Sequence, residues 1–152
     1  MTRLVTFPST TPRLALPLLH VGQTQKEITV NESILSADFL IDSAIEGVVS
    51  SPPQSPVAGS MWLVGSAPSG DFIGKADHLA GWCDSGWRFF TPRDGMRIFD
   101  LSRSAFRLYR QGWTIATASA APTGGEIVDV QVRAALASLT DALKTAGILS
   151  QS

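Results

Sequence analysis

The residue types needed for nucleophilic catalysis occur in this sequence, but in a poor setting. Cys83 is the single cysteine, and the two histidines are His20 and His78. A catalytic thiolate needs an electropositive, partly open environment and a base within hydrogen-bonding reach. Cys83 instead falls in a predicted hairpin turn beside Asp84, and a neighbouring carboxylate disfavours the thiolate. We therefore predict no nucleophilic catalysis at this cysteine.

Carboxylates form the second group that could do chemistry, as the acid and base of glycoside hydrolysis. They are Asp71, Asp77, Asp84, Asp94 and Asp100. Most lie in turn-rich positions, where aspartate bonds backbone amides, so a structural role is favoured. The sequence has too few thiols and imidazoles for a structural zinc site, and it contains no nucleotide-binding or metalloprotease motif. We expect no catalytic, cofactor-binding or metal-binding residues and hence no enzyme.

Aromatic residues are the third group, and they concentrate between His78 and Thr117, which contains three of the four tryptophans. An exposed indole on a strand can stack on a sugar ring. The polar neighbours of these tryptophans also suit inward packing, which we favour. If a glycan is bound, we expect Trp87 and Trp113 to contact it.

This aromatic stretch contains two predicted hairpins, at Gly81–Phe90 and at Phe106–Ile115. In each, aromatic and β-branched residues flank a short polar turn with glycine, which is typical of a hairpin. Met61–Val64 and the start of 48–60 are further predicted strands. The sequence thus predicts a small antiparallel β-meander in an α+β fold.

A helix is predicted within 23–46, at about residues 30–43. Its apolar residues recur at spacings of three and four. The start stays open, because both Thr24–Glu27 and Thr29–Glu32 fit a capping box.

A second, amphipathic helix is predicted over 127–149, after a flexible hinge at 118–126. Asp129 can cap its start, and Gly147 can supply the left-handed residue after its end. Spacings of 4, 3, 4 and 3 separate Val132, Leu136, Leu139, Leu143 and Ala146. This seam fits either docking on the same domain or a short bundle of identical chains.

Residues 1–22 are predicted to form an extended arm ahead of an α+β body at 23–117. Pro8, Pro12 and Pro17 disfavour a helix there. An extended apolar arm needs a groove, either on its own domain or on a neighbouring subunit. The N-terminal sequence lacks a continuous apolar segment, so we expect synthesis in the cytoplasm without a signal peptide.

The composition limits the classes of partner. Hydrophobic residues make up 44% and charged residues 16% of the chain, a balance that builds a core and argues against disorder. The net charge of −1 provides no basic field for nucleic acid. No apolar run reaches the roughly 18 residues that a membrane span needs. We expect neither nucleic acid nor membrane as a partner.

Several motifs occur together in this sequence: Thr11–Pro17, Gly22–Glu27, Val30–Glu32, Pro52–Gly59 with Met61–Val64, and Gly86–Gly95. Their combination resembles an uncharacterised domain family of alphaproteobacterial prophages and gene transfer agents. The resemblance covers about residues 11–115. It implies a virion protein of the head-spike or tail-fibre type, some of which bind capsular polysaccharide. It implies no catalytic residues. Larger members carry a C-terminal receptor-binding domain, whereas this sequence stops after one helix, which favours an anchor or base.

We therefore expect a non-enzymatic structural component of a phage-like particle, anchoring or forming the base of a head spike or tail fibre. Its partners would be other virion proteins and copies of itself, a trimer being favoured over a pentamer. The expected assembly contacts are Pro12, Leu14, Leu16, Leu18, Val132, Leu136, Leu139 and Leu143. The alternative is a carbohydrate-binding module that recognises a host surface polysaccharide.

Overall fold

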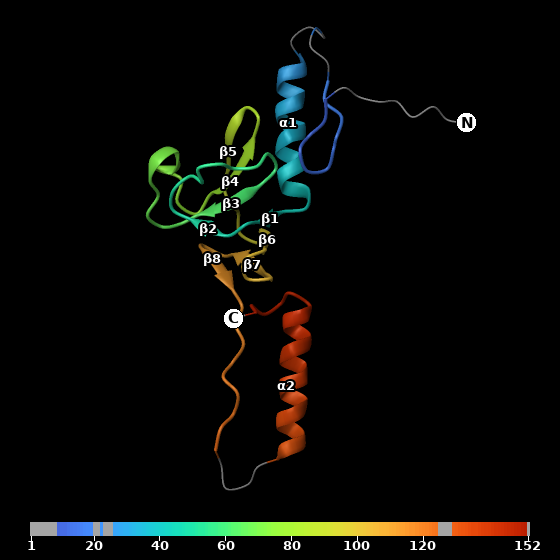
Figure 1. The fold of residues 1–152 in the computed structure, drawn as a ribbon, viewed down its shortest axis with the longest axis vertical. Coiled ribbons are helices and arrows are strands. Elements are labelled where there is room, and N and C mark those ends of the chain that lie inside the picture. Colours follow the sequence, from blue (N-terminus) through green and yellow to red (C-terminus); the bar gives the residue numbers. More distant parts are fainter. Residues whose placement is uncertain (1–8, 20–21, 23–25, 125–128, 152) are drawn as a thin grey trace, which may run out of the picture. The chain divides into compact units, whose positions relative to one another are not determined.

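The computed structural model describes residues 9–19, 22, 26–124 and 129–151. Its chain forms two compact units (Figure 1). Unit 1 comprises residues 1–43 and 48–91, and unit 2 comprises residues 44–47 and 92–152. The described part contains two α-helices and eight strands, which confirms the predicted α+β class. The predicted body at 23–117 contributes to both units.

A four-stranded sheet forms the centre of unit 1. Its order is β2 (Val48–Val49), β3 (Met61–Val64), β4 (Leu79–Cys83) and β5 (Gly86–Phe90). β2 is parallel to β3, whereas β3, β4 and β5 form an antiparallel meander. The first predicted hairpin is confirmed, with Trp82 opposite Trp87 across a two-residue turn.

The two faces of this sheet have different covers, as the alternation of strand side chains requires. Helix α1 (Lys26–Ile41) covers one face through Phe39, which is fully buried and contacts Phe90. Phe72, from the short 3-10 helix Gly70–Phe72, packs on the other face with Val64 and Ala80.

The bounds of α1 differ from the prediction of about 30–43. The helix begins at Lys26, so Thr29 lies inside it and the capping box at Thr29–Glu32 is wrong. Thr24 lies outside the described residues. The Ser43 hydroxyl bonds the carbonyl of Phe39 at 3.2 Å, and strand β1 (Ala44–Ile45) follows directly. Two residues are too few to show strand periodicity, which is why this strand was predicted as helix.

Gly81 allows the close contact between α1 and the sheet. A Cβ at this position would lie 2.7 Å from Cε1 of Phe39. Because the ring is fully enclosed, it has little room to move. We expect Gly81→Ala to lower the free energy of unfolding by about 2 kcal/mol, as measured by chemical denaturation. Adding Phe39→Leu should recover part of this loss. If the effects of the two substitutions on the free energy of unfolding were simply additive, a steric clash between the added Cβ and the Phe39 ring would be refuted.

Unit 2 contains the second sheet, in the order β1, β6 (Arg97–Asp100), β7 (Ala105–Tyr109) and β8 (Trp113–Ile115). β1 is parallel to β6, and the other strands are antiparallel. The second predicted hairpin is therefore confirmed as β7–β8.

Helix α2 (Val130–Thr145) has both of its predicted ends. The Asp129 carboxylate accepts hydrogen bonds of 3.0 Å from the amides of Gln131 and Val132. Gly147 has a φ of 70°, and the amide of Ile148 reaches back to the carbonyl of Leu143 at 2.9 Å. Phe106 of β7 also donates its amide to the Gly147 carbonyl at 2.8 Å. The C-terminal end of α2 is thus fixed to the sheet of unit 2.

Candidate functional site

The described part of the arm folds back on itself. Thr10 and Pro17 form an antiparallel bridge, and Thr11 donates its amide to the carbonyl of Leu16 at 2.9 Å. Ala15 adopts a φ of 52° in the turn between them. This loop, residues 9–19, lies on helix α1 of the same chain (Figure 1). The described part of the arm therefore lies on its own domain, which is the first of the two places predicted for it.

Asp38 on α1 is the main anchor of this loop. Its fully buried carboxylate accepts hydrogen bonds from the Thr11 hydroxyl at 2.7 Å, the Leu14 amide at 2.8 Å and the Arg13 amide at 3.0 Å. The Arg13 guanidinium also donates to the backbone carbonyl of Asp42 at 2.9 Å. A charged acceptor inside the protein must be well bonded, and this one binds three donors.

Two further polar residues of α1 hold neighbouring segments. Asn31 exchanges two hydrogen bonds with the backbone of Leu19, at 2.8 and 3.1 Å. Glu32 forms a bidentate ion pair with Arg88 on β5, one of whose bonds is 2.6 Å long. Arg88 Nε also lies 3.2 Å from Sγ of Cys83.

The ion pair shifts both titrations in the expected direction. The hydrogen bonds from Arg88 hold the pKa of Glu32 below its ordinary value, with burial acting in the opposite direction. The hydrogen bond to Glu32 raises the pKa of Arg88 above its ordinary value. Half of the Glu32 side chain is exposed, so the pair positions β5 on α1 more than it stabilises the unit.

Together these contacts give a structural role to polar residues of the motifs. Thr11, Arg13, Asn31, Glu32 and Arg88 each bond another segment of unit 1. Their side chains join the arm loop, α1 and the β4–β5 hairpin. Asp38, which none of the sequence motifs includes, completes this set.

The four expected arm contacts divide into two pairs. Pro12 and Leu14 are exposed, Leu14 to 41% of its surface, whereas Leu16 and Leu18 are half-buried. Pro12 and Leu14 therefore present apolar surface away from their own domain. A contact of these residues with another subunit stays a prediction.

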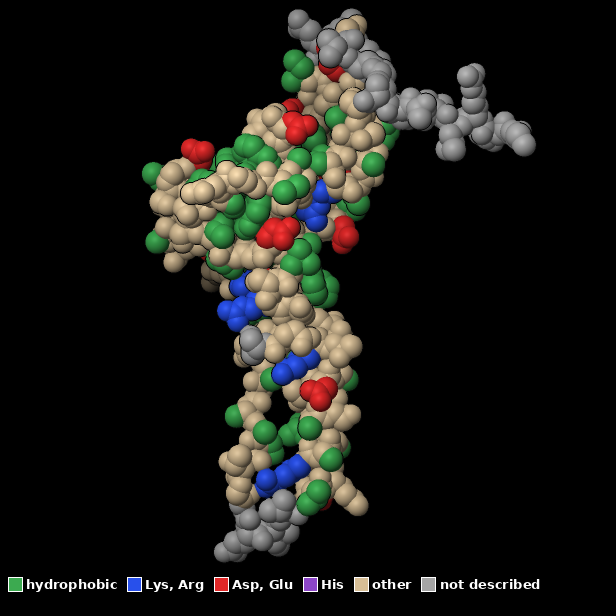
Figure 2. Space-filling model, in the orientation of Figure 1, with side chains coloured by type: hydrophobic (Ala, Val, Ile, Leu, Met, Phe, Trp, Pro, Cys, Tyr) green, Lys and Arg blue, Asp and Glu red, His purple; other side chains and the backbone are tan. Residues whose placement is uncertain are grey.

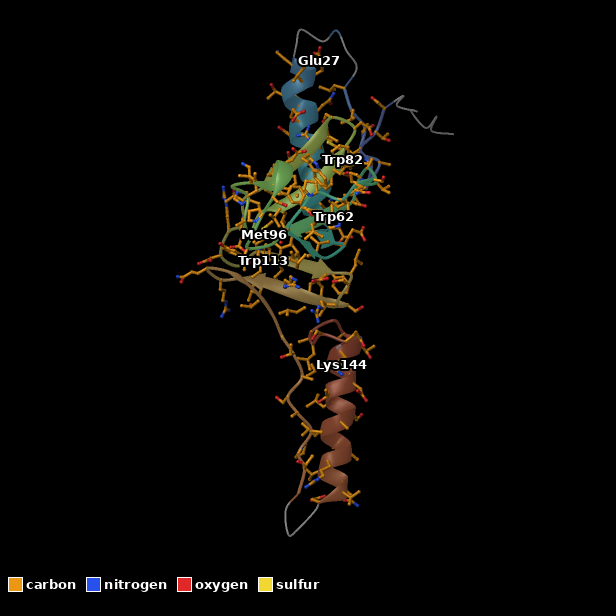
Figure 3. The ribbon with its side chains drawn as sticks, turned by 60° about the vertical axis from the view of Figure 1, so that its left-hand side comes forward. Glu27, Trp62, Trp82, Met96, Trp113 and Lys144 are labelled. Carbon is orange, nitrogen blue, oxygen red and sulfur yellow. The ribbon has the colours of Figure 1, made fainter. Side chains whose placement is uncertain are left out.

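The four tryptophans fall into two separate groups. In unit 1, Trp87 lies 4.9 Å from Trp82, 5.7 Å from Trp62 and 4.9 Å from Phe72, between ring centroids. All three pairs are edge-on, so these rings do not form a flat platform. Two of the rings, Trp62 and Trp82, are labelled in Figure 3. Trp62 is part of this group because β3 pairs with β4. The sequence could predict this only if that strand pairing were known, because side chains alternate between the two faces of a sheet.

Trp113 belongs to unit 2, where it packs edge-on against Tyr109 at 5.2 Å. All four tryptophans are half-buried. The two expected glycan contacts, Trp87 and Trp113, therefore lie in different units and are not brought into one described site.

Several of the candidate residues for catalysis make structural contacts. Cys83 is buried, and His78 lies between the carbonyl of Ala76 at 2.9 Å and the hydroxyl of Thr91 at 3.3 Å. His20 lies outside the described residues. Asp94 and Asp100 bond backbone amides in turns. Across the described ranges, no three of the His, Cys, Asp and Glu side chains are grouped as a metal site would require.

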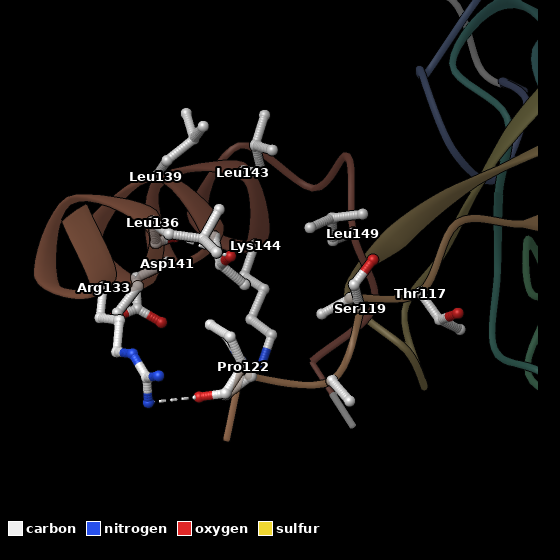
Figure 4. Close-up of a pocket in the computed structure, with 15 residues that line it drawn as sticks. Thr117, Ser119, Pro122, Arg133, Leu136, Leu139, Asp141, Leu143, Lys144 and Leu149 are labelled. Carbon is white, nitrogen blue, oxygen red and sulfur yellow. Dashed lines mark hydrogen bonds between the residues drawn. The ribbon is translucent and has the colours of Figure 1, made fainter. Parts of the chain in front are cut away.

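Helix α2 is the least covered element of the described structure. None of its residues is buried, and Val132 and Leu139 are 62% and 56% exposed. An open groove of about 560 Å³ separates α2 from residues 117–124, a segment that we call the strap (Figure 4). Arg133 joins the two by donating to the carbonyls of Pro122 and Gly124. Among the residues described, no helix has the length and hydropathy of a membrane span.

A family profile described as "Protein of unknown function (DUF2793)" matches residues 30–114, more than half of the chain. The chain belongs to this family. The DUF2793 match includes Asn31, Glu32, Asp38 and Arg88, and it ends before the strap and α2. No curated protein and no solved structure matches the chain.

Proposed function

We propose that this DUF2793 protein is a non-enzymatic structural component of a phage-like particle, a gene transfer agent or a phage. It anchors, or forms the base of, a head spike or tail fibre. Its partners are other virion proteins and copies of itself, with a trimer favoured over a pentamer. The motif resemblance to prophage and gene-transfer-agent domains supports this class of particle, and the geometry of the chain supports a structural role.

The exposed helix α2 is the observation that carries this proposal. A 16-residue helix has little stability in water unless an apolar face is covered. In α2 no side chain is buried, while both ends of the helix are well formed and its C-terminal end is fixed to β7. Such a helix is suited to contact a further protein chain. The hydrogen bonds and the ion pair described for unit 1 meanwhile join its segments into one body, as a structural component of a particle requires.

Purified particles from a producing strain provide the test. We expect quantitative mass spectrometry to find this chain at a fixed copy number, and imaging to find particles without spikes or fibres when its gene is deleted. Absence of the chain from purified particles would refute the proposed function. Unchanged particles after deletion would refute the anchoring role.

A carbohydrate-binding module is the second candidate, favoured by the half-exposed Trp113–Tyr109 pair. Trp113 is the cleaner probe, because Trp87 packs on the core residue Phe72. We expect Trp113→Ala to weaken binding to host surface polysaccharide by about tenfold on a glycan array, since a stacked ring contributes roughly 1–1.5 kcal/mol. Arg110→Ala, in the neighbouring turn, is the control. Equal binding by Trp113→Ala and the unchanged protein would remove this candidate.

A further inference from the structure

We infer that one end of the sheet in unit 2 binds an acidic segment of another protein chain; this rests on the proposed function, whose partners are proteins. This end, which we call the arginine end, carries Arg93, Arg97 and Arg110. Five of the nine arginines of the chain lie between positions 93 and 110, whereas the three lysines lie elsewhere. Arginine suits the binding of carboxylates in a fixed geometry, because its planar guanidinium offers paired donors.

The guanidinium groups of the arginine end have no carboxylate partner of their own. All three residues are exposed, and none of them forms an ion pair with another described residue. Arg107 differs, because it is paired with the buried Asp100. Arg97 is held 4.5 Å above the ring of Phe106, a contact that uses the face of the guanidinium and leaves its N–H donors for an anion. Figure 2 shows a group of Lys and Arg side chains over the sheet of unit 2.

Backbone hydrogen bonds hold the two loops of the arginine end together. The Gly95 amide donates to the Tyr109 carbonyl at 2.9 Å, and the Tyr109 amide donates to the Met96 carbonyl at 2.9 Å. Gly95 has a φ of 89°, so two successive residues face Tyr109, as in a bulge that begins with glycine. The Asp94 carboxylate accepts the amide of Gln111 at 2.9 Å. These fixed loops reduce the ordering cost of binding a partner.

The local charge favours an acidic partner. At the arginine end, three arginines stand against one aspartate, Asp94, which leaves two positive charges unbalanced. The whole chain has a net charge of −1, so this excess is local. Nucleic acid requires a broader basic surface. A short run of carboxylates matches the size of the arginine end.

The neighbouring strand edge favours a peptide over an acidic polysaccharide. β8 is the last strand in the order of its sheet. Because the backbone groups of Tyr109 bond the β6 side, alternation directs those of Leu108 to its partner Thr114 in β8. The amide and carbonyl of Ile115 therefore point away from β7. An extended peptide can pair with such an edge through its own backbone, which a polysaccharide cannot do.

Fluorescence anisotropy with a labelled peptide provides the test. The probe has about ten residues that alternate glutamate and threonine, so one side of the extended peptide is acidic. We expect the full chain to bind it, to bind more weakly as salt rises, and not to bind the same peptide with glutamine for glutamate.

Two exposed arginines of the β6–β7 hairpin give a matched pair of variants. Arg110→Ala should weaken binding of the glutamate peptide by at least about fivefold. Arg103→Ala removes the same charge at the opposite end of this hairpin, so it should weaken binding by less than about twofold. Circular dichroism of both variants checks the fold. Equal losses in the two variants, or no binding by the unchanged protein, would overturn the inference.

A third variant separates a peptide from an acidic polysaccharide. Ile115→Pro removes an amide on the open side of an edge strand, where proline is tolerated. It should weaken peptide binding by at least about threefold and leave binding of polygalacturonate unchanged. Stronger binding of polygalacturonate than of the peptide would overturn the inference, as would loss of glycan-array binding in Arg110→Ala.

The particle experiment is independent of these measurements. If the chain occurs in particles but does not bind the glutamate peptide, the proposed function stands and this inference falls. If the chain is absent from particles but Arg110→Ala alone loses the peptide, the acidic-peptide surface stands and the particle role falls.

Discussion

Asp38→Ala is expected to release residues 9–19 from α1 and to lower the free energy of unfolding by about 3–4 kcal/mol. Three donors lose their acceptor at once: the hydroxyl of Thr11 and the amides of Arg13 and Leu14. Hydrogen bonds to a charged group each contribute roughly 1.5–3 kcal/mol, and water replaces part of this once the loop opens. Because the carboxylate is fully buried, the change also leaves a cavity.

Hydrogen exchange followed residue by residue measures the release directly. The amides of Arg13 and Leu14 should lose protection first, while β4 and β5 keep theirs, because the β4–β5 pairing does not depend on the arm. Chemical denaturation of the same variant measures the global loss. Protection at Arg13 and Leu14 equal to that of the unchanged protein would contradict the role of Asp38.

Asp42→Ala is the matched control, one turn further along the chain. Asp42 is exposed, and it accepts from Arg13 through its backbone carbonyl, which the substitution keeps. We expect a change within about 0.5 kcal/mol, as at most surface positions. A similar loss in both variants would mean that charge near the end of α1, and not the three hydrogen bonds, holds the arm.

The arm loop illustrates what the sequence could not predict. Thr11 and Asp38 are 27 positions apart, and Glu32 and Arg88 are 56 apart. Such pairs arise only once the helix has been placed on the sheet, so no local pattern reports them. The prolines correctly excluded a helix from residues 9–19, but they did not show that the chain turns back at Ala15.

Features with local causes were predicted well. The β4–β5 hairpin follows from aromatic residues on both sides of a short polar turn, and the ends of α2 follow from Asp129 and Gly147. The division into two units was missed because β1 and β2, two residues each, carry too little pattern. The seam of α2 was visible in the sequence, but its orientation relative to the strap depends on Arg133 and the joint at Gly147.

Asp100→Ala is expected to be among the most damaging substitutions in unit 2, lowering the free energy of unfolding by about 3–5 kcal/mol. The fully buried carboxylate accepts a hydrogen bond of 2.7 Å from Arg107 Nε and another of 2.6 Å from the Ser102 hydroxyl. Its loss leaves the largely buried Arg107 guanidinium without its counter-ion. Asp94→Ala is the control, because that carboxylate is exposed and accepts a hydrogen bond from the amide of Gln111.

Titration of the Asp100 carboxylate makes the stability of unit 2 depend on pH. Burial by itself raises the pKa of Asp100, but hydrogen bonds from Ser102 and Arg107, the positive charge of Arg107 and the Arg103 amide hold that pKa below its ordinary value. A folded-state pKa below the unfolded one means that the unfolded chain binds the proton more readily. The contribution of Asp100 is therefore complete above about pH 4 and is lost as the pH falls through the folded-state pKa.

Urea denaturation between pH 7 and pH 2 separates this carboxylate from the other acidic groups. The stability of the unchanged protein should fall more steeply below about pH 4 than that of Asp100→Asn, which lacks the titrating proton. Asp100→Asn should be the less stable variant at pH 7, and the two curves should converge in acid. Parallel curves would show that Asp100 has the same pKa in the folded and unfolded chain. Its stabilising role would then come from the shape of the β6–β7 turn, and not from its charge.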